Sequence, residues 1–457
     1  MLTSEALKRP KRADKRSPSG LSVLKAEAEG WSVLTNCRRQ RAKIIRMPHS
    51  AARNDAPRER EASNRRPILL AVAVATVGVL PAFLTGGLAV QIRDELDFGS
   101  AALGLAVAAF FASSSLASAI MGRLVERIGF HRGMRLAAIG SAASLFGVAL
   151  LAGSWAGLVA CLVLGGLANA VLHPATNLSL AREVPAGRQG LSFGVKQAAI
   201  PAATLLAGLA VPGIALTFGW RWAFAGGAVI ALAVALFVPA GTPGGVVRRL
   251  EEAREKDARV APLVLLALGI GLGSTATAPL GSFLVESSVA AGLRVDTAGL
   301  LLALGSAVNI VVRVAFGHLA DGMSGGRLRL VAAMLGIGVV GFALLASGES
   351  ALILPGALLA FGAGWGWPGL FNFAVVKTSP GAPAAATGVT QTGASGGAAL
   401  GPLLFGLVVE AASYDVAWLV SAAIALGALA AILAGRRMVL RDRRLAAQGS
   451  WGKPSDG

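Results

Sequence analysis

Two basic side chains lie within long apolar stretches of the sequence, and they are the first candidates for chemistry. Lys196 precedes Gln197, and Arg313 follows Asn309 by about one helical turn. A charge inside hydrocarbon is costly and usually serves a function. Each cation can bind an anionic group, or its long side chain can reach back to a polar interface. The first interpretation makes all four residues candidate substrate-binding residues, and both interpretations stay open here.

Polar side chains at helical spacing form a second group of candidates. Asn169, His173 and Asn177 are spaced by four residues, which places them on one face of a helix. Gln391 lies between two threonines in another apolar stretch. These side chains can donate hydrogen bonds to a bound solute, or they can form polar pairs between packed helices.

Two tryptophans lie in a stretch that is unsuited to a straight helix. Trp365 and Trp367 alternate with glycines directly before Pro368. Proline removes a backbone donor, and small residues let neighbouring backbones approach, so a bent or broken helix is expected. Either indole ring can stack on a substrate or pack between helices.

No arrangement typical of an enzyme or a metal site occurs in the sequence. The two cysteines, Cys37 and Cys161, and the four histidines are scattered, without the spacing of metal ligands. Phosphate-binding and nucleophile motifs are also absent from the sequence. We therefore expect no catalytic residues, no metal ion and no cofactor.

The composition favours a membrane protein over a soluble one. The chain has 457 residues, of which 54% are hydrophobic and 14% charged, with a mean hydropathy of +0.66. Soluble domains carry about 25% charged residues, so an ordinary soluble enzyme is excluded. The net charge of +18 is compatible with cationic loops of a polytopic membrane protein or with a nucleic-acid binder.

Twelve apolar runs follow a basic segment at 1–66, which we expect to be a disordered cytoplasmic tail. A helix needs about 20 apolar residues to cross a bilayer. The runs lie at 67–92, 101–121, 134–153, 155–181, 190–216, 223–240, 261–285, 297–319, 328–347, 351–376, 384–409 and 416–435. We therefore expect an all-α polytopic membrane protein with two six-helix halves, 67–240 and 261–435. A cytoplasmic linker at 241–260 and a basic tail at 436–457 complete the predicted organisation.

The distribution of basic residues predicts the orientation. With the N-terminus inside, the inner loops hold fourteen Lys and Arg residues and the outer loops hold three. We therefore expect both termini in the cytoplasm and the chain in the plasma or inner membrane. The positive charge then reflects topology, and no nucleic-acid partner is expected beside the lipid bilayer.

The two predicted halves resemble each other at an offset of 194 residues, at which Pro174 pairs with Pro368 and Gln197 with Gln391. A duplicated six-helix unit is a known basis for alternating access, with the substrate bound between the halves.

A loop motif identifies the family that the sequence resembles. The second run is followed by GRLVERIGFHR (122–132), and the eighth by GHLADG (317–322). Both resemble the cytoplasmic loop motif of the major facilitator superfamily, Gly-x-Leu-Ala-Asp-Arg-x-Gly-Arg-Lys. Glu126 replaces the usual Asp and Gly322 replaces an Arg, so the match is imperfect. The resemblance implies a gating role for six residues: Gly122, Glu126, Arg127, Gly129, Gly317 and Asp321.

In that superfamily the motif latches the outward-open state, and a carboxylate pairs there with a cation. The resemblance thus implies a secondary active or facilitative transporter, expected to be monomeric, that moves a small organic solute by alternating access. Two buried cations without a mid-helix carboxylate favour an anionic solute. The alternatives are an efflux pump for amphiphilic compounds and a non-transporting membrane receptor or scaffold.

Overall fold

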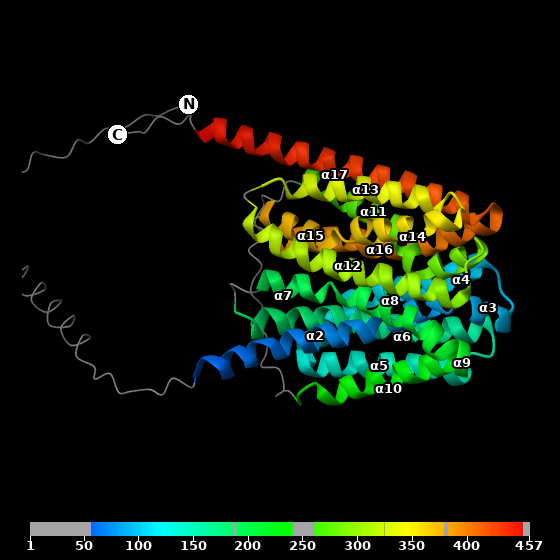
Figure 1. Cartoon of the computed structure of the whole chain (residues 1–457). Helices are drawn as coiled ribbons and strands as arrows, with labels where there is room; N and C mark the ends of the chain where they lie inside the picture. Colours follow the sequence, from blue (N-terminus) through cyan, green and yellow to red (C-terminus); the bar gives the residue numbers. More distant parts are fainter. Residues whose placement is uncertain (1–55, 186–188, 241–259, 324, 379–382, 451–457) are drawn as a thin grey trace, which may run out of the picture. The chain divides into compact units, whose positions relative to one another are not determined.

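The computed structural model describes residues 56–185, 189–240, 260–323, 325–378 and 383–450, and these are helical apart from short connections. The chain divides into two units, Met1–Glu61 and Ala62–Gly457. Among the described residues, twelve helices are long and apolar enough to cross a membrane, and all of these spans lie in the second unit. The predicted number of spanning helices is confirmed. Figure 1 shows these spans as the helix bundle of the second unit.

The first six spans form the N-terminal half. Their elements, in chain order, are α2 (Ala56–Gly87), α3 (Ala89–Leu96), α4 (Ser100–Ile128), α5 (Phe130–Leu151), α6 (Trp155–Glu183), α7 (Gln189–Lys196), α8 (Ala199–Ala210), the π-helix η2 (Val211–Ala215), α9 (Leu216–Phe218) and α10 (Trp220–Phe237). The first predicted run contains two helices, because the chain turns at Leu88 between α2 and the short α3.

The last six spans form the C-terminal half. Their elements are α11 (Val260–Ala290), α12 (Val295–Gly322), α13 (Arg327–Leu345), α14 (Ser350–Leu359), the π-helix η3 (Ala360–Gly364), α15 (Pro368–Thr378), α16 (Pro383–Ala411) and α17 (Tyr414–Ser450). The tenth span is interrupted between η3 and α15, as the glycines and Pro368 predict.

Two helices extend into the segments predicted as tails. The first, α2, begins at Ala56, within the predicted tail 1–66, and α17 continues to Ser450, within the predicted tail 436–457. The predicted linker 241–260 lies outside the described residues apart from Val260.

The halves meet most extensively at two helix pairs: α4 packs against α16, and α8 packs against α12. Small residues make this possible, because a helix backbone approaches a neighbour closely only where side chains are small. A Cβ atom added at Gly208 would lie 2.6 Å from the carbonyl oxygen of Gly299. The hydroxyl oxygens of Thr204 and Ser306 lie 2.7 Å apart in the same α8–α12 contact.

The helix bundle has two ends, which differ in what they contain. We call the end with α3 and α9 the α3 end, and the opposite end, with the turn at Gly129 and the C-termini of α6 and α12, the far end (Figure 1). Gly129 has a φ of 85°, so the turn between α4 and α5 requires a backbone conformation that glycine tolerates.

Candidate functional site

Arg313 is 6% exposed, and its guanidinium group lies between the two halves. Its Nε donates to Asn309 Oδ1 (2.6 Å), Nη2 to the carbonyl of Trp365 (2.9 Å) and Nη1 to the carbonyl of Gln197 (2.7 Å). The first two acceptors belong to the C-terminal half and the third to the N-terminal half. Arg313 therefore makes a direct contact across the interface, and all three of these acceptors are neutral.

The carbonyl of Gln197 is available because of a proline. In an α-helix that oxygen would accept a hydrogen bond from residue 201, and Pro201 has no N–H group to donate. The chain tightens here, with a hydrogen bond from the Gln197 amide to Gly194 O (3.1 Å), and α7 ends before α8 begins. The guanidinium of Arg313 thus replaces a missing backbone donor.

The same logic applies to the break in the tenth span. Pro368 cannot donate to the carbonyl of Gly364, and the indole Nε1 of Trp367 donates to it instead, at 2.7 Å. Trp367 is fully buried, and its ring lies edge-on to Phe371 with centroids 5.9 Å apart. Its position is therefore in the core of the C-terminal half.

Asn309 connects Arg313 to η3. Its side chain is fully buried, and Nδ2 donates to the carbonyl of Phe361 at 2.7 Å. Because Asn309 also accepts from Arg313, its amide fixes the position of the guanidinium relative to η3. The sequence predicts Asn309 and Arg313 one turn apart, and the structure brings both to the irregular backbone around Trp365.

Trp365 forms an aromatic contact between the halves. Its ring centroid lies 5.6 Å from that of Phe361 and 6.1 Å from that of Phe83 on α2. Phe83 continues the chain of rings to Phe111 on α4, with centroids 6.3 Å apart. Trp365 is 8% exposed, so its ring packs on protein in this state.

Lys196 is also buried and also bonds to a neutral group. It is 7% exposed, and its Nζ donates to Asn177 Oδ1 at 2.6 Å. Asn177 itself is exposed, and His173, one turn earlier on α6, is half-buried. Three of the predicted residues, from α6 and α7, are therefore close together within the N-terminal half.

Asn169 lies further along the same face of α6. Its Nδ2 donates to Ser114 Oγ on α4 at 2.8 Å, and its Oδ1 is buried without a partner among the described residues. The sequence does not single out Ser114, because it is one of three consecutive serines and nothing distinguishes it from the other two. Gln391 on α16 is exposed.

Among the described residues, no group of three or more His, Cys, Asp or Glu side chains is placed to hold a metal ion. The candidate residues supply two cations, amides, a histidine and aromatic rings. This composition suits the reversible binding of a polar organic molecule.

Comparison with known proteins decides the family. The model of the Major Facilitator Superfamily matches residues 68–348. The chain belongs to this superfamily. Its helices and its relatives make it an integral membrane protein of the transporter class, whose members are in general not enzymes.

Individual relatives of this superfamily member match most of this chain and most of their own length. A chloramphenicol resistance protein of Streptomyces lividans is 29% identical over 353 residues, which cover 74% of this chain and 87% of that protein. A bacterial homologue of the human lysosomal transporter Spinster, in an inward-facing and occupied conformation, has a TM-score of 0.64 at 17% identity, with 82% of this chain and 97% of that one covered. The human organic anion transporter MFSD10 has a TM-score of 0.58 at 18% identity, with coverage of 81% and 99%. The two structures establish the shared fold.

The superfamily motif lies at the far end. Glu126 and Arg127 are both exposed on the last turns of α4, and nothing lies within 4 Å of a Cβ added at Gly122 or Gly317. The side chain of Asp321 is outside the described residues. The expected pairing of Glu126 with a cation belongs to the outward-open state of the family, and it stays a prediction.

Sequence reasoning missed a polar cluster at the α3 end. Arg93 pairs there with Glu286 of the other half, although the sequence by itself places each only in a loop or at a helix end facing outward. The presence of a basic and an acidic residue at the same predicted end of the bundle was a signal that an ion pair could form there. Their pairing was not readable, because nothing in the sequence shows which helices of the two halves are neighbours.

Proposed function

We propose that the chain is a secondary carrier of a small organic anion and that Arg313 and Lys196 hold the negative charge of the substrate. One observation supports this proposal: both cations are buried, and the groups that accept their hydrogen bonds are neutral. A buried charge is stabilised best by an opposite charge, and a bound carboxylate would supply one. The amides of Asn169, Asn177 and Gln391 would add hydrogen bonds.

The proposal is tested by uptake into proteoliposomes that contain the purified full chain. A panel of small carboxylates is compared with neutral and cationic analogues of the same size, with and without a pH gradient. We expect the anions to be preferred, and Arg313→Ala to reduce uptake of the best anion by about a hundredfold, as loss of one buried charge-assisted contact predicts.

Arg294→Ala is the matched control. Arg294 is also a cation on the C-terminal half, but it is exposed and pairs with Asp296 at 2.5 Å. Its removal is expected to leave uptake unchanged. Full uptake by the Arg313→Ala variant would overturn the anion site.

A second candidate function is export of amphiphilic compounds, and the relative in Streptomyces lividans favours it. Cells that express the chain would then accumulate less chloramphenicol than cells without it, and Arg313→Ala would have little effect on a neutral solute. Absence of flux for anions and for chloramphenicol, in liposomes and in cells, would instead support a receptor or scaffold.

We also propose that the far end faces the cytoplasm, because basic residues dominate the predicted loops there. A membrane-impermeant thiol reagent added to intact cells would then label a cysteine at Ala412, which is exposed at the α3 end. It would not label one at Arg132, which is exposed at the far end. The reverse pattern would contradict this orientation.

A further inference from the structure

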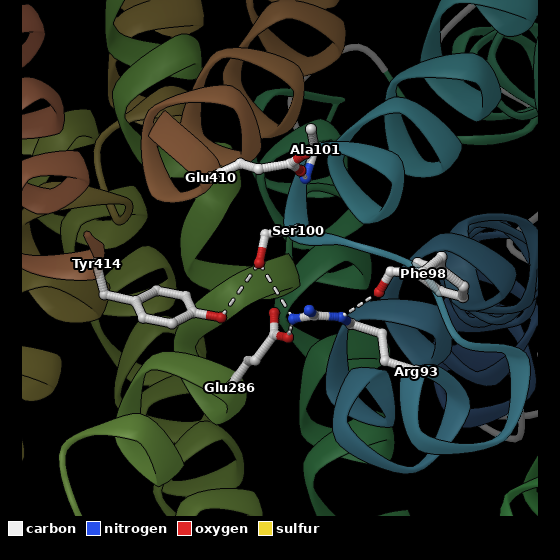
Figure 2. A network of polar contacts seen from close by, with 7 residues as sticks. All are labelled: Arg93, Phe98, Ser100, Ala101, Glu286, Glu410 and Tyr414. Atoms are coloured by element: carbon white, nitrogen blue, oxygen red, sulfur yellow. Dashed lines mark hydrogen bonds and ion pairs between the residues drawn. The ribbon is translucent and has the colours of Figure 1, made fainter. Parts of the chain in front are cut away.

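A polar cluster joins the halves at the α3 end (Figure 2). Arg93 of α3 donates through Nε to the carbonyl of Phe98 (2.8 Å) and through Nη1 to Ser100 Oγ (3.1 Å). The same Nη1 forms an ion pair with Oε1 of Glu286 on α11. Two of the three partners of Arg93 therefore belong to its own half, and the third is the carboxylate of the other half.

Glu286 depends on this one cation. Its side chain is 8% exposed, and its second oxygen, Oε2, is buried without a hydrogen-bond partner among the described residues. The side chain of Arg93 is 26% exposed. A buried carboxylate with a single charged partner loses most of its stabilisation when that partner moves away.

Glu410 of α16 forms a second bridge. Its Oε2 accepts a hydrogen bond from the backbone amide of Ala101, at 2.9 Å, in the first turn of α4. The residue before α4, Gly99, has no side chain to cap the helix, and a Cβ there would lie 2.8 Å from Glu410 Oε2. A carboxylate from the other half therefore serves as the cap, which the helix dipole favours.

A hydroxyl contact completes the cluster. Ser100 Oγ and Tyr414 Oη of α17 lie 3.5 Å apart. In all three contacts the C-terminal half supplies an acidic or phenolic oxygen, and the N-terminal half supplies a cation, a backbone amide or a hydroxyl. Separation of the halves at this end must break every one of them.

Other charged groups at the α3 end are paired elsewhere or exposed. Glu95 binds Trp220 and Arg221 within its own half, and Arg294 pairs with Asp296. Like Glu410, the remaining acidic residues are exposed: Asp94, Asp97, Glu349 and Asp415. Within the described part of the chain, Arg93 is thus the cation that neutralises Glu286.

We propose that Glu286 and Glu410 form a proton-controlled gate that holds the α3 end closed while both carboxylates are ionised. A proton taken from water by a carboxylate oxygen leaves a neutral acid, and the attraction to Arg93 or to the α4 amide falls. Arg93 stays on the N-terminal half through Phe98 and Ser100, so Glu286 is free to leave with its own helix. Acid on this side of the membrane then favours opening of the α3 end.

The proposal does not depend on the identity of the substrate, and its test needs none. Cys37 and Cys161 are replaced by serine, and spin labels are attached at Thr217→Cys and Ala412→Cys. Both sites are exposed at the α3 end and lie on different halves. Pulsed electron paramagnetic resonance then gives the label-to-label distance distribution of the full chain in lipid nanodiscs.

We expect one short distance at about pH 8 and a growing longer-distance population at about pH 5, where an unpaired carboxylate begins to bind protons. Glu286→Gln should produce the longer distance already at the higher pH, with an open-to-closed ratio about tenfold above that of the parent, and Glu410→Gln should act in the same direction. Glu349→Gln, which neutralises an exposed carboxylate of the same end and half, should match the parent.

A charge swap guards against a folding defect in a single variant. The double variant Arg93→Glu/Glu286→Arg should restore the short distance at the higher pH, whereas each single reversal should lose it. A distribution in the parent protein that does not change with pH would overturn the proposal. So would a Glu286→Gln protein that folds and keeps the ratio of the parent.

Discussion

The α4–α16 pair shows two different interfaces at its two ends. At the α3 end the backbones touch: a Cβ added at Gly104 would lie 2.2 Å from Pro402 O, and one at Gly406 would lie 2.4 Å from Ser100 O. Toward the far end nothing lies within 4 Å of a Cβ added at Gly122 or Gly388. The glycine positions at the α3 end are therefore in close contact with the partner helix, whereas those toward the far end touch no neighbour.

Glycine has a different role at each end in this state. At the α3 end glycine permits the close contact, and the carboxylates of the other half add polar bridges. At the far end the motif glycines are available for a contact that is not made here. Alternating access between two halves requires a rocking motion that opens the contact at one end and forms a contact at the other.

The largest expected effect comes from filling the close contact. In Gly104→Val, the new side chain collides with the backbone at Pro402, which cannot move aside as a flexible side chain would. We expect a loss of about 3 kcal/mol of stability, measured as a lower thermal midpoint in detergent. The matched change at the far end, Gly122→Val, should have little effect, and equal losses would contradict the contrast between the ends.

Removing the central cation should have the next largest effect on stability. In Arg313→Met, the buried carbonyls of Gln197 and Trp365 lose a donor, at a cost of about 2 kcal/mol. The thermal midpoint should fall clearly, whereas the exposed control Arg294→Met should keep that of the parent. An unchanged midpoint for the Arg313 variant would show that water replaces the guanidinium without cost.

Loss of the gate cation Arg93 should cost less, because Arg93 is partly exposed and opening of the α3 end would let the unpaired Glu286 reach water. For Arg93→Gln we expect about 1 kcal/mol of destabilisation at neutral pH, from the broken pair with Glu286. Arg132→Gln, at an exposed cation of the far end, is the control. If both variants melt at the same temperature, the ion pair contributes nothing to the closed end.

The smallest expected effect concerns Glu95, which anchors α3 to α10. Hydrogen bonds from Arg221 and Trp220 outweigh desolvation and hold the pKa of Glu95 below its ordinary value. A carboxylate with a lowered folded-state pKa stabilises above the unfolded-state pKa, about 4.3, and loses this contribution as the pH falls through the folded-state value. Glu95→Gln should therefore lower the thermal midpoint slightly at neutral pH, with a difference that disappears in acid.

The fold could be predicted from the sequence because twelve apolar runs have the length that a bilayer imposes. The position of the break at η3 was also readable, since glycines and Pro368 cannot continue a regular helix. The partners of Arg313 could not be predicted. Pro201, four residues after Gln197, does indicate that the carbonyl of Gln197 lacks a backbone donor. Finding that donor requires knowing that α8 packs against α12, which is tertiary information.

The α3-end cluster was less accessible still. Arg93 and Glu286 are far apart in the sequence, and each alone resembles an ordinary interfacial charge. Their pairing depends on how the halves are closed at that end, so it belongs to one conformational state. A sequence describes both states of a carrier at once and does not separate their contacts.

Alternate closure of the two ends of the interface can be measured in a single experiment. Spin-label distances are recorded at the α3 end, between Thr217 and Ala412, and at the far end, between Arg132 and Arg329, which are all exposed. We predict that Glu286→Gln lengthens the first distance and shortens the second. Movement of both distances in the same direction, or a change at one end alone, would show that the two ends do not close alternately.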